Sequence, residues 1–266
     1  MKYSIITINF NNKEGLRKTI ESVIHQTFRD FEYIIIDGGS TDGSKELIEE
    51  YSNNIDYWVS EKDNGIYHAM NKGVKVAHGD YLNFMNSGDC FYNYDVLKVI
   101  QPFLTTDIVE GKVFRKDLKR ISQFQPDNPS MMFFFEGSLD HQATFIKRIL
   151  LEETPYDETL KISADWKFFT KKIIFENCTF SSVPIVVATF EGQGISAQQI
   201  DMLYAERQVT LNQLLPKRVL CDYQKFQGKE SPILNLIPKF NKTYRLHILI
   251  IYTIKTILRI YTFFRH

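Results

Sequence analysis

This chain of 266 residues has few cysteines and no formal net charge. The three cysteines, Cys90, Cys178 and Cys221, lie far apart and form no C-x-x-C pair. We therefore expect no disulfide scaffold, and a reducing cytoplasm is the simpler interpretation. The 32 Lys and Arg residues equal the 32 Asp and Glu residues in number, which argues against a generally basic nucleic-acid-binding protein and against an acidic disordered chain. A hydrophobic content of 44% is enough for a full core.

Two common nucleotide-binding motifs are missing as well. A dehydrogenase would carry G-x-G-x-x-G directly after its first strand, but the sequence N-F-N-N at 9–12 follows the first apolar run here. There is also no G-x-x-x-x-G-K-[ST] phosphate loop. The apolar run at 3–8 is too short for an export signal and ends at polar Asn9, so we interpret it as a buried strand.

The sequence does contain a regular alternation of strand and helix patterns. Short apolar, β-rich runs alternate with segments whose apolar residues repeat at helical spacing, such as Leu16, Ile20 and Val23. This order predicts an α/β fold with a mostly parallel sheet flanked by helices. We expect strands at 4–8, 32–36, 55–59, 80–85, 107–114 and 180–187, helices at 44–51, 66–76, 164–174 and 197–215, and an apolar loop or strand at 123–135.

Polar residues follow several of the predicted strands. Asn9, Asp37, the stretch 61–65 and Asp89 each come after one. Ligands of such sheets bind beyond the carboxyl ends of the strands, so we expect these residues to meet at one edge. Each alone is typical of a turn, but their recurrence after successive strands favours a binding site.

Four segments in order carry a resemblance to a known family. They are SIITINFNN at 4–12, IDGGSTDGS at 36–44, SEKDNGIYHAMNKG at 60–73 and GDYLNFMNSGD at 79–89, with shorter matches HQ at 141–142, SADW at 163–166 and GQGIS at 192–196. Over about residues 2–215 the sequence resembles a family-2 inverting glycosyltransferase of the GT-A fold. The resemblance implies a catalytic domain at 1–215, with a nucleotide-sugar-binding half at 1–112 and an acceptor half at 113–215. It also implies a nucleotide-sugar donor, with UDP as the expected nucleotide.

The resemblance assigns several residues to the donor. Asp37 matches an Asp that binds the base, and its carboxylate can accept the N3–H of a uracil. Thr7 matches a Thr that contacts the base, and Asn9 flanks the same crevice. Asp63, Asn64 and Gly65 form a polar turn. Asn71, Lys72 and Ser87 complete the predicted donor site, where Asn71 and Lys72 meet ribose or phosphate; Lys72 could instead be a solvated surface lysine.

Asp89 is the predicted metal ligand. Many relatives carry D-x-D at this place, whereas this chain has Ser87-Gly88-Asp89 and lacks the first carboxylate. One carboxylate together with diphosphate oxygens and waters can hold Mn²⁺ or Mg²⁺. The alternative is that Asp89 caps the helix near Asn93. Because the first carboxylate is missing, a second interpretation stays open, in which the protein is catalytically degenerate and only binds sugar or acts as a scaffold.

Asp165 is the predicted general base, because the matching Asp of the family deprotonates the acceptor hydroxyl and the products are inverted. The alternative is that Asp165 starts the helix at 164–174, where an acid is favourable. His141, Gln142 and Trp166 belong to the matching short motifs and are expected to line the donor-sugar or acceptor site. The alternative for His141 is a structural role, because a single histidine is as often structural as functional.

The end of the chain differs from the rest. Ten Lys or Arg residues but only two Asp or Glu residues lie between Lys217 and His266. The stretch 244–264 is apolar, but Lys255 and Arg259 near its centre make a membrane-spanning helix costly. We expect a basic tail at 216–266 that contains an amphipathic helix on an anionic membrane surface. The alternative is that this helix packs on the catalytic body or on a second copy of the chain.

A membrane-bound tail suits an acceptor that is itself anchored, such as a lipid-linked glycan. The sequence thus predicts a cytoplasmic enzyme, peripheral on the inner face of the cytoplasmic membrane, in bacterial surface-polysaccharide assembly.

Deletion of the chain from Tyr244 onward should release the protein from anionic vesicles, because the basic apolar stretch supplies the lipid contact. Co-sedimentation with vesicles of anionic and of neutral lipid measures this. A truncated chain that still sediments with anionic vesicles would show that the tail is not the membrane-binding element.

Overall fold

The computed structural model of the chain describes residues 1–122, 126–190 and 199–228. The chain divides into two compact units, Met1–Leu214 and a second that begins at Leu215. The second unit contains helix α10 (Lys217–Gly228), whereas the tail helix expected at 244–264 lies outside the described residues. Within those described ranges, no helix combines the length and the apolar character that crossing a membrane requires.

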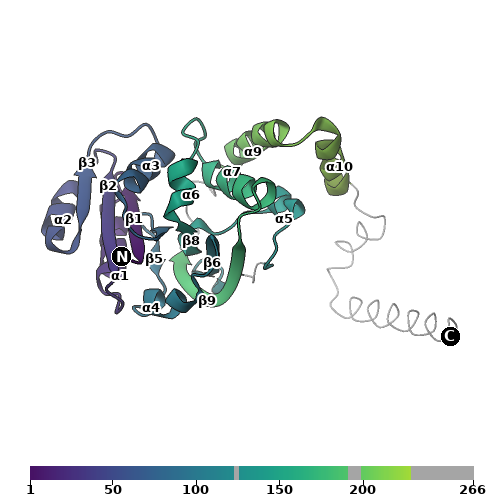
Figure 1. The fold of residues 1–266 in the computed structure, drawn as a ribbon. Helices are drawn as coiled ribbons and strands as arrows, with labels where there is room; N and C mark the ends of the chain where they lie inside the picture. Colours follow the sequence, from purple (N-terminus) through teal and green to yellow (C-terminus); the bar gives the residue numbers. More distant parts are fainter. Residues whose placement is uncertain (123–125, 191–198, 229–266) are drawn as a thin grey trace, which may run out of the picture. The chain divides into compact units, whose positions relative to one another are not determined.

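The first unit is built on one large sheet (Figure 1). Its strands are β1 (Tyr3–Asn9), β2 (Phe31–Asp37), β3 (Tyr57–Ser60), β4 (Tyr81–Phe84), β5 (Cys90–Phe91), β6 (Ile108–Arg115), β7 (Arg120–Ile121), β8 (Thr144–Lys147) and β9 (Phe180–Phe190). Its helices are α1 (Lys13–Ile24), α2 (Ser44–Glu50), η1 (Ser52–Asn54), α3 (Ile66–Val76), α4 (Val96–Ile100), η2 (Gln101–Phe103), α5 (Met131–Glu136), η3 (His141–Ala143), α6 (Arg148–Glu153), α7 (Ala164–Thr170), the π-turn η4 (Lys171–Phe175) and α9 (Ile200–Leu214).

The strands follow the order β3-β2-β1-β4-β8-β6-β9-β5, with β7 paired to β6. The first four strands are mutually parallel, β6 and β9 are also parallel to each other, and β8 is antiparallel to both of its neighbours. The register places Asn9 beside Asp37 and Asp37 beside Ser60. Three strands therefore end in line at one edge of the sheet.

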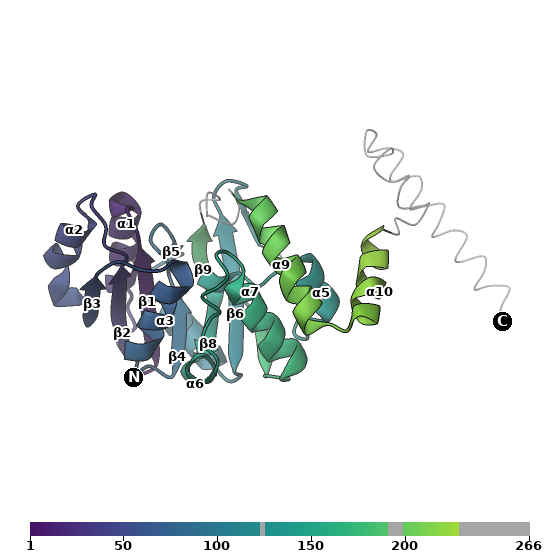
Figure 2. The ribbon, with the colours of Figure 1, turned by 90° about the horizontal axis from the view of Figure 1, so that it is seen from above.

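Helices cover both faces of the sheet (Figures 1 and 2). On one face, α1, α2 and α4 bury apolar side chains such as Leu16 and Leu47 against Tyr3 and Ile5 of β1. On the other face, Tyr156 packs against Phe84 of β4 and Phe168 of α7. Because both faces are covered, β1 and β2 are nearly continuous apolar runs rather than alternating ones.

The predicted fold class is confirmed, and the predicted strands of the N-terminal half match β1 to β4 closely. Two local expectations differ from the structure. Residues 131–136 form helix α5, not an apolar loop or strand, because the hydroxyl of Ser130 accepts a hydrogen bond from Phe133 N (3.4 Å) and caps a helix start. The sequence analysis also missed β8, a four-residue strand inserted between β4 and β6.

Gly79, in the turn before β4, should not tolerate a side chain. Its backbone N–H donates to Ser4 Oγ (2.8 Å) and to Glu32 Oε1 (3.1 Å), and an added Cβ would collide with the backbone of Tyr3 and Ser4. We expect Gly79→Ala to cost about 1–3 kcal/mol of unfolding free energy, the usual cost of overpacking. Urea unfolding measures this. Gly137→Ala is the matched control, since its Cβ would meet only Phe133 O at 3.5 Å; equal stability of both variants would contradict the prediction.

Candidate active site

The parallel strands end in polar residues that lie side by side. Asn9, Asp37 and Ser60 are aligned across β1, β2 and β3. The loop after β4 begins beside them, because Ser87 N donates to Ile8 O at 3.0 Å. The structure thus brings the polar ends of four strands to one edge of the sheet, where parallel α/β sheets bind ligands.

Asp37 is fully buried and holds the ends of three strands together. Oδ1 accepts hydrogen bonds from Asn9 Nδ2 (2.7 Å) and Ser40 Oγ (2.5 Å), and Oδ2 accepts from Ser40 N (2.9 Å) and Ser60 Oγ (2.6 Å). Burial raises the pKa of Asp37, but these hydrogen bonds outweigh burial and leave the pKa below its ordinary value. A nucleobase would reach this carboxylate only by displacing one of the four donors.

Thr7 does not reach the edge of the sheet. Its side chain is fully buried, Oγ1 donates to Met85 O (2.7 Å), and the same oxygen lies 3.0 Å from the hydroxyl of Tyr33. The predicted contact of the Thr7 side chain with a base is therefore wrong. Since side chains alternate along a strand, Thr7 faces the same side as Ile5, which packs in the core that contains α1.

An exposed aromatic ring stands at the end of β1 instead. Phe10 is 67% exposed, and an added Cβ on Gly38 would lie 3.2 Å from its ring and 3.4 Å from Asp63 Oδ2. A flat ring at this place can stack on a nucleobase. Phe10 was not predicted from the sequence, although an aromatic residue directly after a buried strand was a usable signal.

The ammonium group of Lys72, on α3, lies between two carboxylates of the segment after β3. Lys72 Nζ lies 2.6 Å from Asp63 Oδ1 and 2.6 Å from Glu61 Oε1, and His68 Nδ1 lies 3.1 Å from the same Asp63 oxygen. Burial lowers the pKa of Lys72, but its hydrogen bonds to Asp63 and Glu61 raise the pKa above its ordinary value. Lys72 is thus part of an ion-paired cluster rather than a solvated surface lysine.

Asp63 also offers an unused acceptor. Its side chain is only 8% exposed, and its Oδ2 is buried without a hydrogen-bond partner among the described residues. A ribose hydroxyl is a suitable donor for such an oxygen. Asn64 and Gly65, in the same turn, are exposed, and Gly65 adopts a φ of 122° that favours glycine.

Asn71 faces the body of the protein and not the predicted ribose. Its side chain is buried, Nδ2 donates to Tyr156 O (2.9 Å) and Glu158 Oε1 (2.9 Å), and Oδ1 accepts from Tyr156 N (3.0 Å). The predicted ribose or phosphate contact of Asn71 is wrong, because adjacent helix residues point about 100° apart. Lys72, one residue later, lies in the ion-paired cluster.

The loop after β4 is fastened to α1. Thr19 Oγ1 donates to Asp89 O (2.7 Å) and accepts from Gly88 N (3.0 Å), and Asn12 Nδ2 donates to Ser87 O (3.0 Å). Asp89 is half-buried. Burial raises the pKa of the neighbouring Cys90 thiol, and the charges of Lys116, Asp89 and Lys18 also act on that thiol. Neither lysine was predicted from the sequence.

His141 connects this loop to Asp165. Its Nε2 lies 3.2 Å from Asn86 Nδ2, and its Nδ1 lies 3.6 Å from Asp165 Oδ2. The imidazole thus has one ring nitrogen beside the Asn86 amide and the other beside the Asp165 carboxylate. The structure therefore joins the end of β4 to the N-terminus of α7 through one imidazole.

Tyr67 supplies a second contact to Asp165. Its hydroxyl donates to Asp165 Oδ1 (2.9 Å), which also accepts from Trp166 N (2.8 Å). Burial and the nearby Asp165 raise the pKa of Tyr67 far above its usual range, so the hydroxyl remains a donor. Tyr67 was not predicted, although it lies inside the motif quoted for 60–73.

The turn that carries His141 is anchored by a buried acid. Glu110 Oε1 accepts from Asp140 N at 2.7 Å. Burial raises the pKa of Glu110 well above its ordinary value, and burial also raises the pKa of Asp140. This pair fixes the backbone next to His141 from the centre of the sheet.

Two predicted sugar-site residues are structural. Trp166 is 1% exposed and donates from Nε1 to Phe134 O (2.7 Å), which holds α7 against α5. Gln142 is 5% exposed, and its backbone carbonyl oxygen accepts a hydrogen bond from Asn83 Nδ2 (3.1 Å). The prediction that the Trp166 side chain lines a sugar site is therefore wrong, and for Gln142 the burial argues for a structural role.

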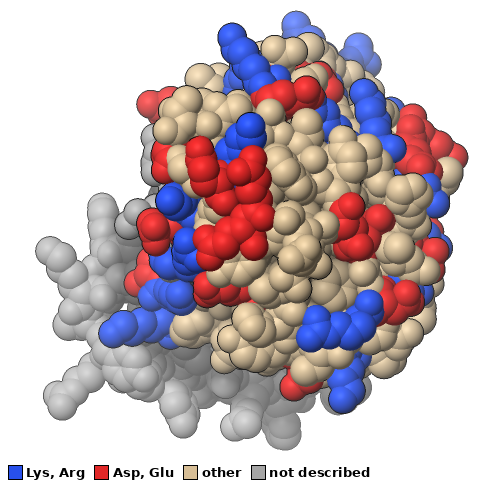
Figure 3. Space-filling view, turned by 90° about the vertical axis from the view of Figure 1, so that its left-hand side faces the viewer, with Lys and Arg blue, Asp and Glu red and all other residues tan. Residues whose placement is uncertain are grey.

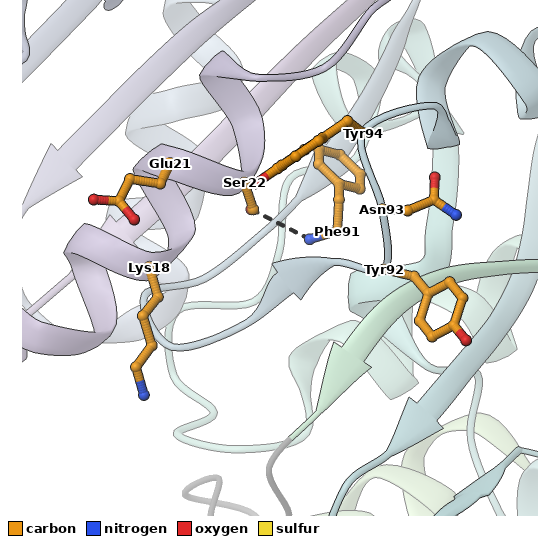
Figure 4. Close-up of a pocket in the computed structure, with 7 residues that line it drawn as sticks. All are labelled: Lys18, Glu21, Ser22, Phe91, Tyr92, Asn93 and Tyr94. Atoms are coloured by element: carbon orange, nitrogen blue, oxygen red, sulfur yellow. Dashed lines mark hydrogen bonds between the residues drawn. The ribbon is translucent and has the colours of Figure 1, made fainter.

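A cavity of about 430 Å³ lies away from the predicted residues. It is bounded by α1 and the segment that follows Cys90 (Figure 4), and its lining residues are Lys18, Glu21, Ser22, Phe91, Tyr92, Asn93 and Tyr94. None of the predicted donor or acceptor residues lines it. We therefore define the candidate site by the convergence of the strand ends and not by this cavity.

The molecular surface does not offer a single broad cationic face in the view of Figure 3, where acidic and basic side chains form separate small groups among uncharged residues.

The loop at 86–89 fits a cation only in part. Among the described residues, no three His, Cys, Asp or Glu side chains gather into a ready-made cation site. Asp89 supplies one carboxylate, and Asn86 Oδ1 is buried without a hydrogen-bond partner in the described part of the chain. These oxygen donors suit Mg²⁺ or Mn²⁺ if phosphate oxygens and waters complete the coordination. The residues present therefore fit a cation held jointly with a diphosphate.

Replacement of Asp37 by Asn should lower the unfolding free energy by about 1–3 kcal/mol at pH 7, because an amide brings donors to a place where four donors already converge. The native pKa lies below the ordinary value, so the stabilising effect of the carboxylate is present above about pH 4 and is lost as the pH falls through the native pKa. Urea unfolding from pH 7 to pH 3 measures the difference, with exposed Asp30→Asn as the control. A difference that grows toward pH 3 would contradict this account.

Comparisons with known proteins agree with this arrangement. The family model described as glycosyl transferase family 2 matches residues 4–169. An uncharacterized glycosyltransferase of Mycobacterium tuberculosis is 31% identical over 204 residues, which cover 74% of this chain and 77% of the relative. The PGL/p-HBAD biosynthesis glycosyltransferase of Mycobacterium bovis is 29% identical over 216 residues, covering 77% and 83% of the two chains.

Two solved structures share the fold. The crystal structure of S. aureus TarS 1–349 in complex with UDP-GlcNAc aligns with a TM-score of 0.65 and 21% identity, over 82% of this chain and 69% of that chain. The mannosyltransferase PcManGT from Pyrobaculum calidifontis, in complex with GDP-Man and Mn²⁺, aligns with a TM-score of 0.60 and 17% identity, over 75% and 60% of the chains. The match over 4–169 spans more than half of the sequence, and the chain belongs to glycosyl transferase family 2 and is a glycosyltransferase.

Proposed function

We propose that this enzyme transfers one sugar from a UDP-sugar to a hydroxyl of a glycan or lipid-linked glycan, with inversion at the anomeric carbon. The observation that carries the proposal is the connection from Asn86 through His141 to Asp165. It links the loop beside the donor diphosphate to a carboxylate that can act as a base. The donor class is supported by TarS, whose structure contains UDP-GlcNAc, and by the exposed ring of Phe10 beside Asp37.

The donor would lie across the ends of the parallel strands. Phe10 would stack on the base, and Asp63 Oδ2 would accept a ribose hydroxyl. Lys18, Lys72 and Lys116 would attract the diphosphate. Phe10 follows β1 and Asp63 follows β3, and both lie within 3.4 Å of the position that a Cβ on Gly38 would occupy. This closeness supports a single nucleoside in contact with both groups.

Asp165 would act on the acceptor. As the acceptor oxygen bonds to the anomeric carbon, its proton passes to the carboxylate of Asp165, and the bond from that carbon to the diphosphate oxygen breaks with its electron pair. His141 and Tyr67 hold the two oxygens of Asp165 from different elements, which keeps the carboxylate oriented toward the reacting hydroxyl.

A divalent cation is the proposed cofactor, held by Asp89 together with the diphosphate. When bound, Mn²⁺ or Mg²⁺ neutralises negative charge on the departing diphosphate. The fit of the oxygen donors at 86–89 supports this assignment, and PcManGT contains Mn²⁺.

The biosynthetic setting is a further part of the proposal. One relative is named for PGL/p-HBAD biosynthesis, which supports a role in building a glycan. The basic stretch toward the C-terminus supports an acceptor held at an anionic membrane on its cytoplasmic side.

Asp165→Asn should lower kcat by about 10²–10⁴, the usual contribution of a general base, while UDP binding stays unchanged. The amide keeps the shape of the side chain but cannot take a proton. Release of UDP from a panel of UDP-sugars measures turnover, and calorimetry with UDP and Mn²⁺ measures binding. Exposed Glu153→Gln is the matched control, and equal loss of turnover and UDP affinity in the Asp165 variant would show that Asp165 is structural.

A further inference from the structure

The carboxylate of Glu206, on helix α9, contacts the segment that leads into α7. Glu206 Oε1 accepts from Lys161 N (2.6 Å), and Oε2 accepts from Ile162 N (3.1 Å), Ser163 N (3.1 Å) and Ser163 Oγ (2.8 Å). Three consecutive backbone N–H groups and one hydroxyl thus converge on a side chain more than forty residues away.

This contact replaces the usual way in which a helix start is fixed. Ser163 occupies the N-cap position of α7 but makes no side-chain capping hydrogen bond. Its hydroxyl instead donates to Glu206. An N-cap serine normally accepts a bond from the first turn. The start of α7 is therefore held from outside, by α9, two residues before Asp165.

The next residue of α9 contacts the other side of the same turn. The guanidinium of Arg207 lies 5.0 Å from the centre of the Trp166 ring. Burial lowers the pKa of Arg207, and the charge of Asp165 acts in the opposite direction, so this cation lies near the Asp165 carboxylate. Glu206 and Arg207 therefore contact residues on both sides of Asp165.

These contacts are a large part of what holds α9 against the rest of the first unit. The buried residues of α9 are Thr210 and Leu211, while Ile200, Met202, Tyr204 and Val209 are exposed. A helix with so small an apolar contact derives its position from specific polar bonds. Glu206 is the residue of α9 that makes four of them.

We propose that Glu206 is a positioning residue for Asp165. This inference rests on the proposed function, in which Asp165 is the base. The Glu206 carboxylate fixes the backbone at 161–163 and so sets the direction of the first turn of α7. The donor groups at the strand ends make no contact with Glu206 in the bonds described, so its loss should affect the chemical step and leave donor binding intact.

Glu206→Gln tests this with little change of shape, because one amide oxygen cannot accept four bonds and the amide N–H groups would face the backbone donors. We expect kcat to fall about 10- to 100-fold, the scale of loss when a reacting group is misplaced by about 1 Å. The KM for the donor and the affinity for UDP should stay within about twofold of wild type. Asp201→Asn, on the same helix and exposed, is the matched control and should behave as wild type.

Amide hydrogen exchange gives a second measurement that does not depend on turnover. In Glu206→Gln, the amides of Lys161, Ile162 and Ser163 should exchange about tenfold faster than in Asp201→Asn, and distant core amides should not change. Glu206→Asp keeps the carboxylate and should recover part of kcat. Ser163→Ala removes one of the four bonds and should show a smaller loss.

The outcomes separate this inference from the proposed function. Wild-type kcat in Glu206→Gln, unchanged exchange at 161–163, or a loss of UDP affinity as large as the loss of kcat would each overturn the positioning role. If Glu206→Gln does not fold, wild-type turnover in both Glu206→Asp and Ser163→Ala would overturn it. If the wild-type enzyme releases no UDP with any sugar acceptor, the proposed function fails, and the exchange comparison still decides whether Glu206 orders the start of α7.

Discussion

One imidazole lies between the end of β4 and the start of α7 in this glycosyltransferase. His141 lies between Asn86, at the end of β4, and Asp165, at the start of α7. The donor groups depend on the ends of the parallel strands, and the proposed base depends on a helix about eighty residues later in the chain. Tyr67 of α3 makes a second contact to Asp165, and the two contacts together set the position of this carboxylate relative to the ends of the strands.

The same site shows how acidic side chains order loops in this fold. Asp37, Glu110 and Glu206 each accept at least one backbone N–H group from a loop. A buried backbone donor that is left unsatisfied is costly, so each of these bonds favours one loop conformation. Loops at the edge of the sheet are thereby held without large apolar contacts, which leaves their surfaces available to a polar donor and acceptor.

Local patterns predicted the parts of this structure that depend on neighbouring residues. The strands β1 to β4 and the convergence of Asn9, Asp37 and the 86–89 loop follow from apolar runs and from the geometry of parallel sheets. The predictions for Asn71 and Trp166 paired each residue with its helix neighbour, Lys72 or Asp165, but adjacent residues of a helix point about 100° apart and cannot face one site. The contact of His141 with Asp165 was not predictable in this way. It depends on β8, a short strand that inserts between β4 and β6 and brings residues distant in sequence together.

A crystal structure of the enzyme with UDP and Mn²⁺ tests the central claim most directly. The account predicts that the diphosphate lies beside Ser87 and Asp89 and that the carboxylate of Asp165 faces it across a space the size of one sugar ring, with His141 still between Asn86 and Asp165. A diphosphate bound elsewhere, or an Asp165 carboxylate directed into a different cavity, would contradict it.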